Sequence, residues 1–291
     1  MRIRLTVVFS IVFVGIAYVN AQNTVTFSTS DVGVDKTVPE WGVDTAWRWD
    51  YLVRQSIVSF GGAGNVDTVR MNFFESEALN TNGTLSNQSK VWINEAAGLA
   101  KIAGIKPISL TPDTGAGTHD WYLNPAGGVY SQRYADLIIA TAQYLLNQHG
   151  LTVETVEVWN EPDWWDGQPT AAQVHQIIAI LRNDPLLQNA KMMGPSTLSP
   201  NTWWYDQIKN SLDQGSTHKL GGSAADYINF IQHVWANGDE FYNPEIHSMA
   251  EMLMGAEYGM VGGIFWADSL NPRGKLVQAL DGGRRLGYAE N

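Results

Sequence analysis

The chain alternates between two patterns of apolar residues. Short runs rich in β-branched and aromatic side chains are typical of buried strands, and most are followed by a segment whose apolar residues recur every three or four positions. The clearest helical pattern joins Tyr134, Leu137, Ile138, Thr141 and Leu145. The predicted strands cover residues 41–46, 66–73, 106–110, 153–159, 191–194, 219–222, 241–246 and 263–266. The predicted helices cover residues 51–58, 91–102, 131–148, 171–181, 203–212, 226–236 and 249–258.

This order of elements predicts an α/β protein of one domain, a (β/α)₈ TIM barrel. Strands that alternate with helices in this way favour a parallel sheet, and about 250 residues is the usual size of a closed barrel. Four glycines, Gly104, Gly150, Gly238 and Gly259, stand where predicted helices should end. The alternative is an open, doubly wound sheet. No glycine-rich dinucleotide-binding turn follows the first strands, which removes the usual reason to prefer the open sheet.

The two ends of the chain carry patterns of their own. A basic start at Met1 to Arg4, an apolar run over residues 5–18 and small residues before Gln22 are typical of a secretory signal peptide. The apolar run is short for a membrane span, although an uncleaved anchor is the alternative. We therefore expect a signal peptide at 1–21, a folded domain at 22–291, and a secreted or periplasmic protein that does not touch the membrane after cleavage.

After the last predicted strand, only a weak helix candidate at 275–280 precedes Asn291. A (β/α)₈ barrel normally ends with a full helix, so we expect this sequence to lack or truncate that helix and to be a fragment of a longer protein. The alternative is a natural end with a short final helix.

Composition narrows the classes of partner. The chain has no cysteine, so a large core rather than disulfides must stabilise it. Its formal net charge of −11 argues against nucleic-acid binding, which needs a basic surface. Twelve tryptophans are many for 291 residues, and aromatic rings are common platforms for sugars. The oligomeric state is left open.

One stretch carries the strongest chemical signal. An apolar, β-branched run ends at Trp159 and is followed directly by Asn160, Glu161 and Pro162. Proline cannot continue a central strand, so the turn begins at Pro162. Asn160 and Glu161 therefore stand at the carboxyl end of the fourth predicted strand, where barrel enzymes hold their catalytic groups.

The loop that follows suits sugar binding. Asp163, Trp164 and Trp165 combine a carboxylate with two aromatic rings, and binding residues concentrate on such loops. We expect these three side chains to contact substrate rather than only to pack the loop. Asp44, at the end of the first predicted strand, is also placed to reach a cleft at this end of the barrel.

Cleavage of a glycoside needs a second carboxylate. Glu245 ends the seventh predicted strand, and His247 lies two residues further on, which places it on the same side if the strand persists. Three rivals remain open: Glu240 at the start of that strand, and Glu251 and Glu257 in the next predicted helix. Placement at the strand end favours Glu245.

The string Trp159-Asn160-Glu161-Pro162 resembles the signature of clan A, the retaining glycoside hydrolases with TIM barrels. The resemblance implies that residues 22–291 form a catalytic domain. It implies that Glu161 is the acid/base and Glu245 the nucleophile, and that Asn160 binds the 2-hydroxyl of the sugar.

Two further positions extend the resemblance. Arg70 resembles the second-strand arginine that supports the nucleophile, and Trp266 resembles the eighth-strand tryptophan beneath the cleaved sugar. The predicted sixth strand departs from the pattern, because it lacks the tyrosine found there in many clan members. His218 and His247 are the candidates to replace it.

Within clan A the chain resembles secreted bacterial enzymes of the agarase and porphyranase type. The implied activity is an endo-acting β-glycanase, agarase-, porphyranase- or β-glucanase-like, on an algal or plant polysaccharide or oligosaccharide, without cofactor or metal. His119 and Asp120 could be metal ligands, but no third ligand has a recognisable spacing. The alternatives are a carbohydrate-binding protein that keeps the barrel without cleaving, and an exo-acting β-glycosidase.

Overall fold

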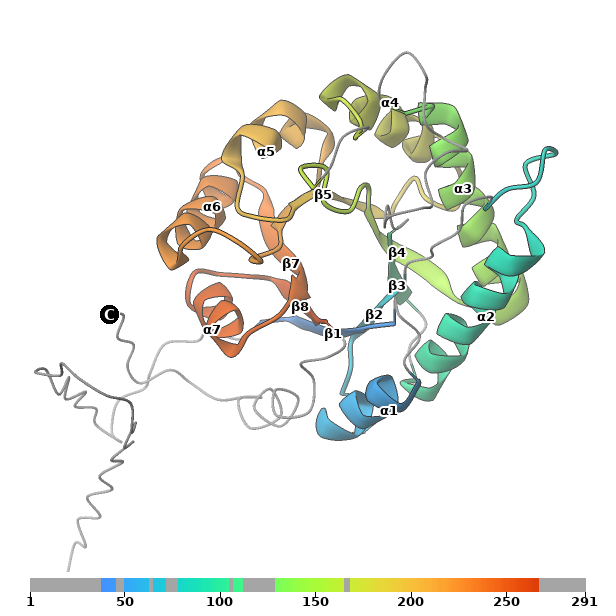
Figure 1. Cartoon of the computed structure of the whole chain (residues 1–291), viewed down its shortest axis with the longest axis horizontal. Helices are drawn as coiled ribbons and strands as arrows, with labels where there is room; N and C mark the ends of the chain where they lie inside the picture. Colours follow the sequence, from blue (N-terminus) through green and yellow to red (C-terminus); the bar gives the residue numbers. More distant parts are fainter. Residues whose placement is uncertain are drawn as a thin grey trace, which may run out of the picture. The chain divides into compact units, whose positions relative to one another are not determined.

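The computed structural model (Figure 1) describes residues 38–45, 50–62, 65–71, 78–104, 107–111, 129–164 and 168–266. All of them belong to one compact unit, Asp35–Arg284. The predicted signal peptide, the region after Trp266, and Trp165, His119 and Asp120 lie outside the described residues.

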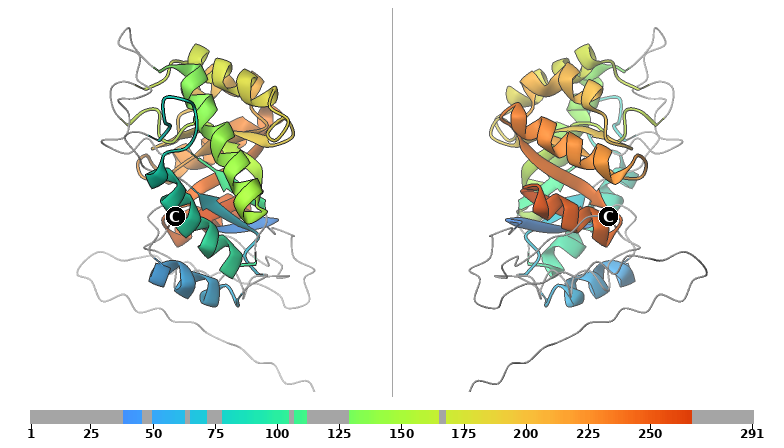
Figure 2. Two further views of the ribbon diagram at one scale, coloured as in Figure 1. Left: turned by 90° about the vertical axis from the view of Figure 1, so that its right-hand side faces the viewer. Right: turned by 90° about the vertical axis from the view of Figure 1, so that its left-hand side faces the viewer.

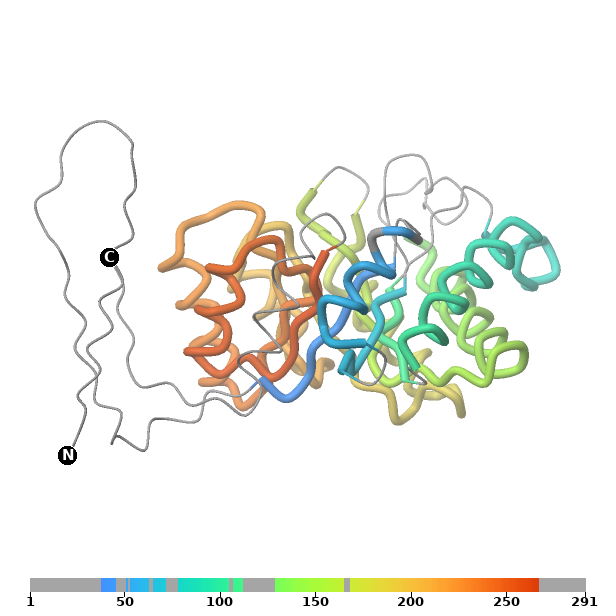
Figure 3. The backbone as a smooth tube through the Cα atoms, turned by 90° about the horizontal axis from the view of Figure 1, so that it is seen from below, coloured from blue at the N-terminus to red at the C-terminus, as the bar shows by residue number. Residues whose placement is uncertain are grey.

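Eight parallel strands form a closed barrel in sequence order. They are β1 (Glu40–Asp44), β2 (Thr68–Met71), β3 (Pro107–Leu110), β4 (Thr152–Glu157), β5 (Lys191–Thr197), β6 (Gln214–Thr217), β7 (Glu240–Ile246) and β8 (Gly262–Phe265). β8 pairs in parallel with β1, so the first and last strands lie side by side and close the barrel (Figure 3). The predicted (β/α)₈ architecture is confirmed.

Helices surround the barrel, as two side views show (Figure 2). They are α1 (Asp50–Ser59), α2 (Asn87–Ile102), α3 (Ser131–Tyr144), α4 (Ala171–Arg182), α5 (Thr202–Ile208), α6 (Ala224–Ala236) and α7 (Met249–Glu257). The helical stripe read from the sequence is buried, with Tyr134 and Ile138 fully inaccessible. α3 continues into a π-helical turn that ends at Gly150, which takes the left-handed conformation that glycine permits. Within the described part of the chain, no helix has both the length and the apolar character to cross a bilayer.

The predicted sixth strand was wrong: β6 is Gln214–Thr217 and not 219–222. This strand has four residues and no apolar side chain, so it lacks the pattern by which the other strands were recognised. Gly215 faces the helices, and a Cβ atom there would lie 2.5 Å from Val234 of α6. An outward-facing strand position usually carries an apolar side chain. At Gly215 the closely packed α6 fills that space instead.

The amino-terminal half of the barrel interior is filled by side chains. Met193, Tyr242 and Ile264 form a cluster of their own, separate from the core between barrel and helices. A Cβ atom on Gly262 would lie 2.0 Å from the Tyr242 ring, so this large ring fits because glycine faces it. The Tyr242 hydroxyl donates a hydrogen bond to Glu40 Oε1 at 2.5 Å. We call these five residues the floor of the barrel.

Candidate active site

The backbone of Glu161 has a strained conformation, which a hydrogen bond to the end of β5 stabilises. Glu161 has φ +51°, a left-handed conformation that residues other than glycine rarely adopt. Ser196, at the equivalent end of β5, also has φ +51°. The Glu161 N–H donates to the Ser196 carbonyl at 2.9 Å, so the two strained residues support each other. Strain of this kind concentrates at functional sites, where neighbouring structure holds it in place.

A bulge in β7 decides where Glu245 points. Asn243 pairs with Gly263 and Ile246 with Phe265, so three steps along β7 match two along β8. Pro244 has no N–H for the ladder, and the Asn243 side chain accepts from the Glu245 N–H at 3.0 Å instead. Strict alternation from Tyr242, which faces the interior, would turn Glu245 outward. The bulge turns it into the mouth of the barrel.

Arg70 lies at the centre of the mouth and is fully buried. The charges of the carboxylates around it outweigh the effect of burial and raise its pKa well above the ordinary value. Its guanidinium donates at 2.7 Å to Asp44, Glu157 and Glu245, and at 2.8 Å to the Asn160 amide oxygen. One cation therefore fixes side chains from β1, from the end of β4 and from β7.

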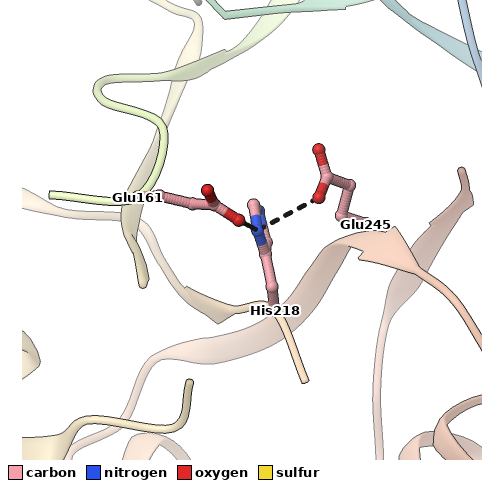
Figure 4. A group of neighbouring side chains, drawn as sticks. All are labelled: Glu161, His218 and Glu245. Atoms are coloured by element: carbon pink, nitrogen blue, oxygen red, sulfur yellow. Dashed lines mark hydrogen bonds and ion pairs between the residues drawn. The ribbon is translucent and has the colours of Figure 1, made fainter. Parts of the chain in front are cut away.

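His218, directly after β6, lies between the two predicted catalytic carboxylates (Figure 4). Its Nδ1 lies 2.8 Å from Glu161 Oε1 and 3.2 Å from Glu245 Oε2, and its Nε2 lies 3.5 Å from Glu157 Oε1. Burial by itself lowers the pKa of His218, but the charge of Glu245 and the contacts with Glu157 and Glu161 raise it to about 10. This shift favours the imidazolium at neutral pH, with a hydrogen bond at Nδ1 to Glu161 and an ion pair without a hydrogen bond between Nε2 and Glu157.

The two carboxylates are close enough to act on one sugar. One oxygen of Glu161, one oxygen of Glu245 and a ring nitrogen of His218 all lie within 4.8 Å of one another. Retaining glycosidases keep their carboxyl groups about 5–5.5 Å apart and inverting enzymes about 6.5–9.5 Å. The same three atoms could surround a metal ion only if it displaced the proton from Nδ1 of His218.

His247 and Trp266 border the nucleophile candidate. His247 Nε2 lies 3.7 Å from Glu245 Oε2, and its ring lies 5.4 Å from the Trp266 ring. Burial lowers the pKa of His247 and the nearby Glu245 only partly opposes this, so His247 is neutral at pH 7. The structure thus has His247 beside Glu245, the side on which the sequence placed it, and has the Trp266 ring against His247.

The loop after Glu161 is only partly described. Asp163 Oδ1 accepts a hydrogen bond from the Leu198 N–H at 2.8 Å, which ties this loop to the one after β5. Trp164 is 60 % exposed, and Trp165 lies outside the described residues. Trp159 instead belongs to the core, because its ring stacks on Tyr134 of α3 with centroids 4.5 Å apart.

The three rival carboxylates have other surroundings. Glu240 opens β7 at the opposite end of the barrel and pairs with Lys191 at 2.9 Å. Glu251 accepts from Ser248 Oγ and from the His247 N–H at the start of α7. Glu257 ends α7. Of these four carboxylates, Glu245 is therefore the one that faces Glu161.

Glu157 is the member of the site that sequence reasoning missed. It is fully buried and binds both Arg70 and His218. The signal was a carboxylate between Val156 and Val158, inside an otherwise apolar strand run. A charged side chain at such a position is rarely buried without a partner, so it could have indicated an internal cation.

Comparisons with known proteins support the fold. No protein-family model matches the chain, and no curated protein matches it in sequence. A GH30 endoxylanase from Clostridium papyrosolvens is similar in structure, with a TM-score of 0.61 and 16 % identity over 88 % of this chain and 75 % of that one. An endo-β1,6-glucanase gives a TM-score of 0.56 and 14 % identity over 84 % and 70 %. These are barrels of glycoside hydrolases, as the resemblance to clan A implies.

A homocysteine methyltransferase from Escherichia coli is also similar, with a TM-score of 0.54 and 12 % identity over 84 % of this chain and 96 % of that one. The same barrel therefore serves unrelated chemistry. Fold likeness establishes the architecture, and the function must be argued from the side chains at the mouth.

Proposed function

We propose that the protein is a retaining glycoside hydrolase. The observation that carries this proposal is the approach of Glu161 and Glu245 to within 4.8 Å across the mouth of the barrel. That separation suits direct attack by one carboxylate on the sugar, because it leaves no room for the water that an inverting enzyme places between substrate and base.

In the first step Glu245 attacks the anomeric carbon and forms a glycosyl ester. Arg70 holds Glu245 Oε1 at 2.7 Å and orients this carboxylate for the attack. Glu161 protonates the departing glycosidic oxygen, so the bond breaks to release an alcohol rather than an alkoxide. In the second step Glu161 takes a proton from water, and the hydroxyl oxygen displaces Glu245 from the anomeric carbon.

Three further side chains are assigned to substrate positioning. Asn160 is the proposed partner of the 2-hydroxyl, and Arg70 fixes its amide through the 2.8 Å hydrogen bond to Oδ1. Trp266 is the proposed platform beneath the cleaved sugar, with His247 against it. Trp164, 60 % exposed three residues after Glu161, is the proposed platform on the outer part of the substrate. Its sequence neighbours Asp163 and Trp165 are also assigned to substrate contact.

We propose a secreted endo-β-glycanase that acts on an algal or plant polysaccharide, of agarase, porphyranase or β-glucanase type. The endo-acting names of the two similar barrels and the exposed tryptophan support an open cleft. The alternative, a binding protein that does not cleave, is disfavoured because both carboxylates are present and face one another. An exo-acting enzyme would release monomers or dimers from chain ends instead.

The test begins with a panel of agar, porphyran, β-glucan, xylan and mannan. We expect one of them to be cut internally, with a rapid fall in viscosity and the β-configuration kept in the first products by NMR. Glu161→Gln should then lose most activity on the polysaccharide while still forming the glycosyl ester from an aryl glycoside, whose leaving group needs no proton. Inverted products, or equal loss on both substrates, would contradict the assignment. Binding of a polysaccharide without cleavage would favour the alternative.

A further inference from the structure

Glu157 has no part in the two chemical steps, yet its position is unusual. It is the last residue of β4, its side chain is inaccessible to solvent, and it lies four residues before Glu161. Its Oε2 accepts from Arg70 Nε at 2.7 Å, and its Oε1 lies 3.5 Å from His218 Nε2. Glu157 therefore lies against both cations of the site.

A buried carboxylate at this place stays charged. Burial by itself raises the pKa of Glu157, but the charge of Arg70 and the contact with His218 lower it to about 2. An isolated carboxylate would instead become neutral, because burying an unpaired charge is costly. At neutral pH Glu157 is thus an anion beside Nε2 of the His218 ring.

The two faces of His218 have different neighbours. Nδ1 faces Glu161 and Glu245, and Nε2 faces Glu157. A neutral ring protonated only at Nε2 would present a lone pair at Nδ1 to two carboxylates, and one protonated only at Nδ1 would present a lone pair to Glu157. Only the imidazolium presents an N–H to the carboxylates on both sides, in a hydrogen bond at Nδ1 and in a 3.5 Å ion pair at Nε2. Among the described residues, the other charged or titratable groups at the mouth are Asp44, Arg70, Asp163 and His247.

We propose that Glu157 is a positioning residue that acts through His218, keeping both ring nitrogens protonated so that Nδ1–H stays directed at Glu161 and Glu245. The consequence for catalysis rests on the proposed glycosidase function. The arrangement of the ring itself does not, and it can be tested without a substrate.

The first measurement uses the unmodified protein. With ¹⁵N-labelled histidine and the His218→Gln spectrum for assignment, both ring nitrogens of His218 should give imidazolium shifts at pH 8. The neutral residue His247 serves as the internal contrast. A neutral tautomer of His218 at pH 7 would overturn the proposal, whether or not any glycoside is cleaved.

The second measurement compares two isosteric variants. Glu157→Gln and Asp44→Asn each remove one buried charge that binds Arg70 at 2.7 Å, but only Glu157 faces His218. We expect Glu157→Gln to lower the midpoint of the His218 titration by about one pH unit or more, and Asp44→Asn to lower it much less. At pH 7, kcat should fall more than KM changes.

Each outcome bears on one proposal. Equal shifts of the His218 midpoint in the two variants would reduce Glu157 to a structural residue and overturn the inference. Glu157→Asp keeps the charge and should retain the wild-type midpoint of the His218 titration. If Glu157→Gln does not fold, this variant tests the inference in its place. If His218 titrates as expected while no glycoside is cleaved, the inference about the ring stands and the proposed function fails.

Discussion

Strand β7 passes through two different environments inside one barrel. At the floor it carries Tyr242, whose ring fills the space opposite Gly262 beside Met193 and Ile264. At the mouth it carries Glu245, which shares Arg70 with other buried carboxylates. The interior of the floor is thus filled chiefly by apolar contact, and that of the mouth by charge pairs.

The two halves differ in what they contribute. Packing at the floor lowers the free energy of the folded state, because close-packed apolar side chains are removed from water. The mouth buries several charges at once, and the cost of removing them from water offsets much of their attraction. Under the proposed function the mouth carries the chemistry and the floor supports it, which gives separable predictions.

The largest effect is expected at the mouth. Glu245→Gln removes the proposed nucleophile and should lower kcat by about 10⁴-fold or more. The melting temperature should change little, because this carboxylate is one of several anions around Arg70. Turnover of a natural glycoside and a thermal melt would check both parts. Substantial residual turnover would reject Glu245 as the nucleophile.

At the floor we expect a substitution to lower stability and to leave turnover unchanged. Gly262→Ala places a Cβ atom 2.0 Å from the Tyr242 ring, and overpacking of this kind costs about 1–3 kcal/mol. The melting temperature should fall by several degrees while kcat of the folded protein is kept. Gly98→Ala in α2 meets no atom within 4 Å and is the matched control, which should be neutral or slightly stabilising. An equal loss in both variants would contradict the packing argument.

Stability should depend on pH mainly through the mouth. The pKa of Glu157 is lowered from 4.5 to about 2, so its contribution is present above pH 4.5 and is lost as the pH falls towards 2. The pKa of His218 is raised from 6.5 to about 10, so its contribution is complete below pH 6.5 and is lost as the pH rises towards 10. We expect the greatest contribution between pH 4.5 and 6.5. Melting curves of His218→Gln should lack the alkaline decline, whereas those of Gly262→Ala should keep it.

The smallest effect is expected at the other end of the same strand. Glu240→Gln removes an exposed pair with Lys191, and such pairs contribute less than about 1 kcal/mol. Activity should be unchanged, which makes this variant the control for Glu245→Gln. A large loss of turnover would show that the two ends of β7 are not separable in the way proposed here.

Much of this architecture was predicted from local pattern. The period of the apolar residues gave all seven described helices to within a few residues, and strand-like runs gave every strand except β6. β6 escaped because its outward position, Gly215, lies directly against α6 and carries no side chain. The motif at Trp159 to Pro162 identified Glu161 as a candidate, because its chemistry is readable from adjacent residues.

The sequence by itself therefore determined the elements, their order and the pair of carboxylates to consider, since local periodicity and strand ends depend on neighbours in the chain. Only the tertiary structure decided what those carboxylates face. The bulge at Pro244 turns Glu245 inward, and closure of the barrel brings Arg70, Glu157 and His218 together from three strands. These residues are remote in sequence, so their ion pairs form only once the closed barrel has brought the charges within a few ångströms of one another.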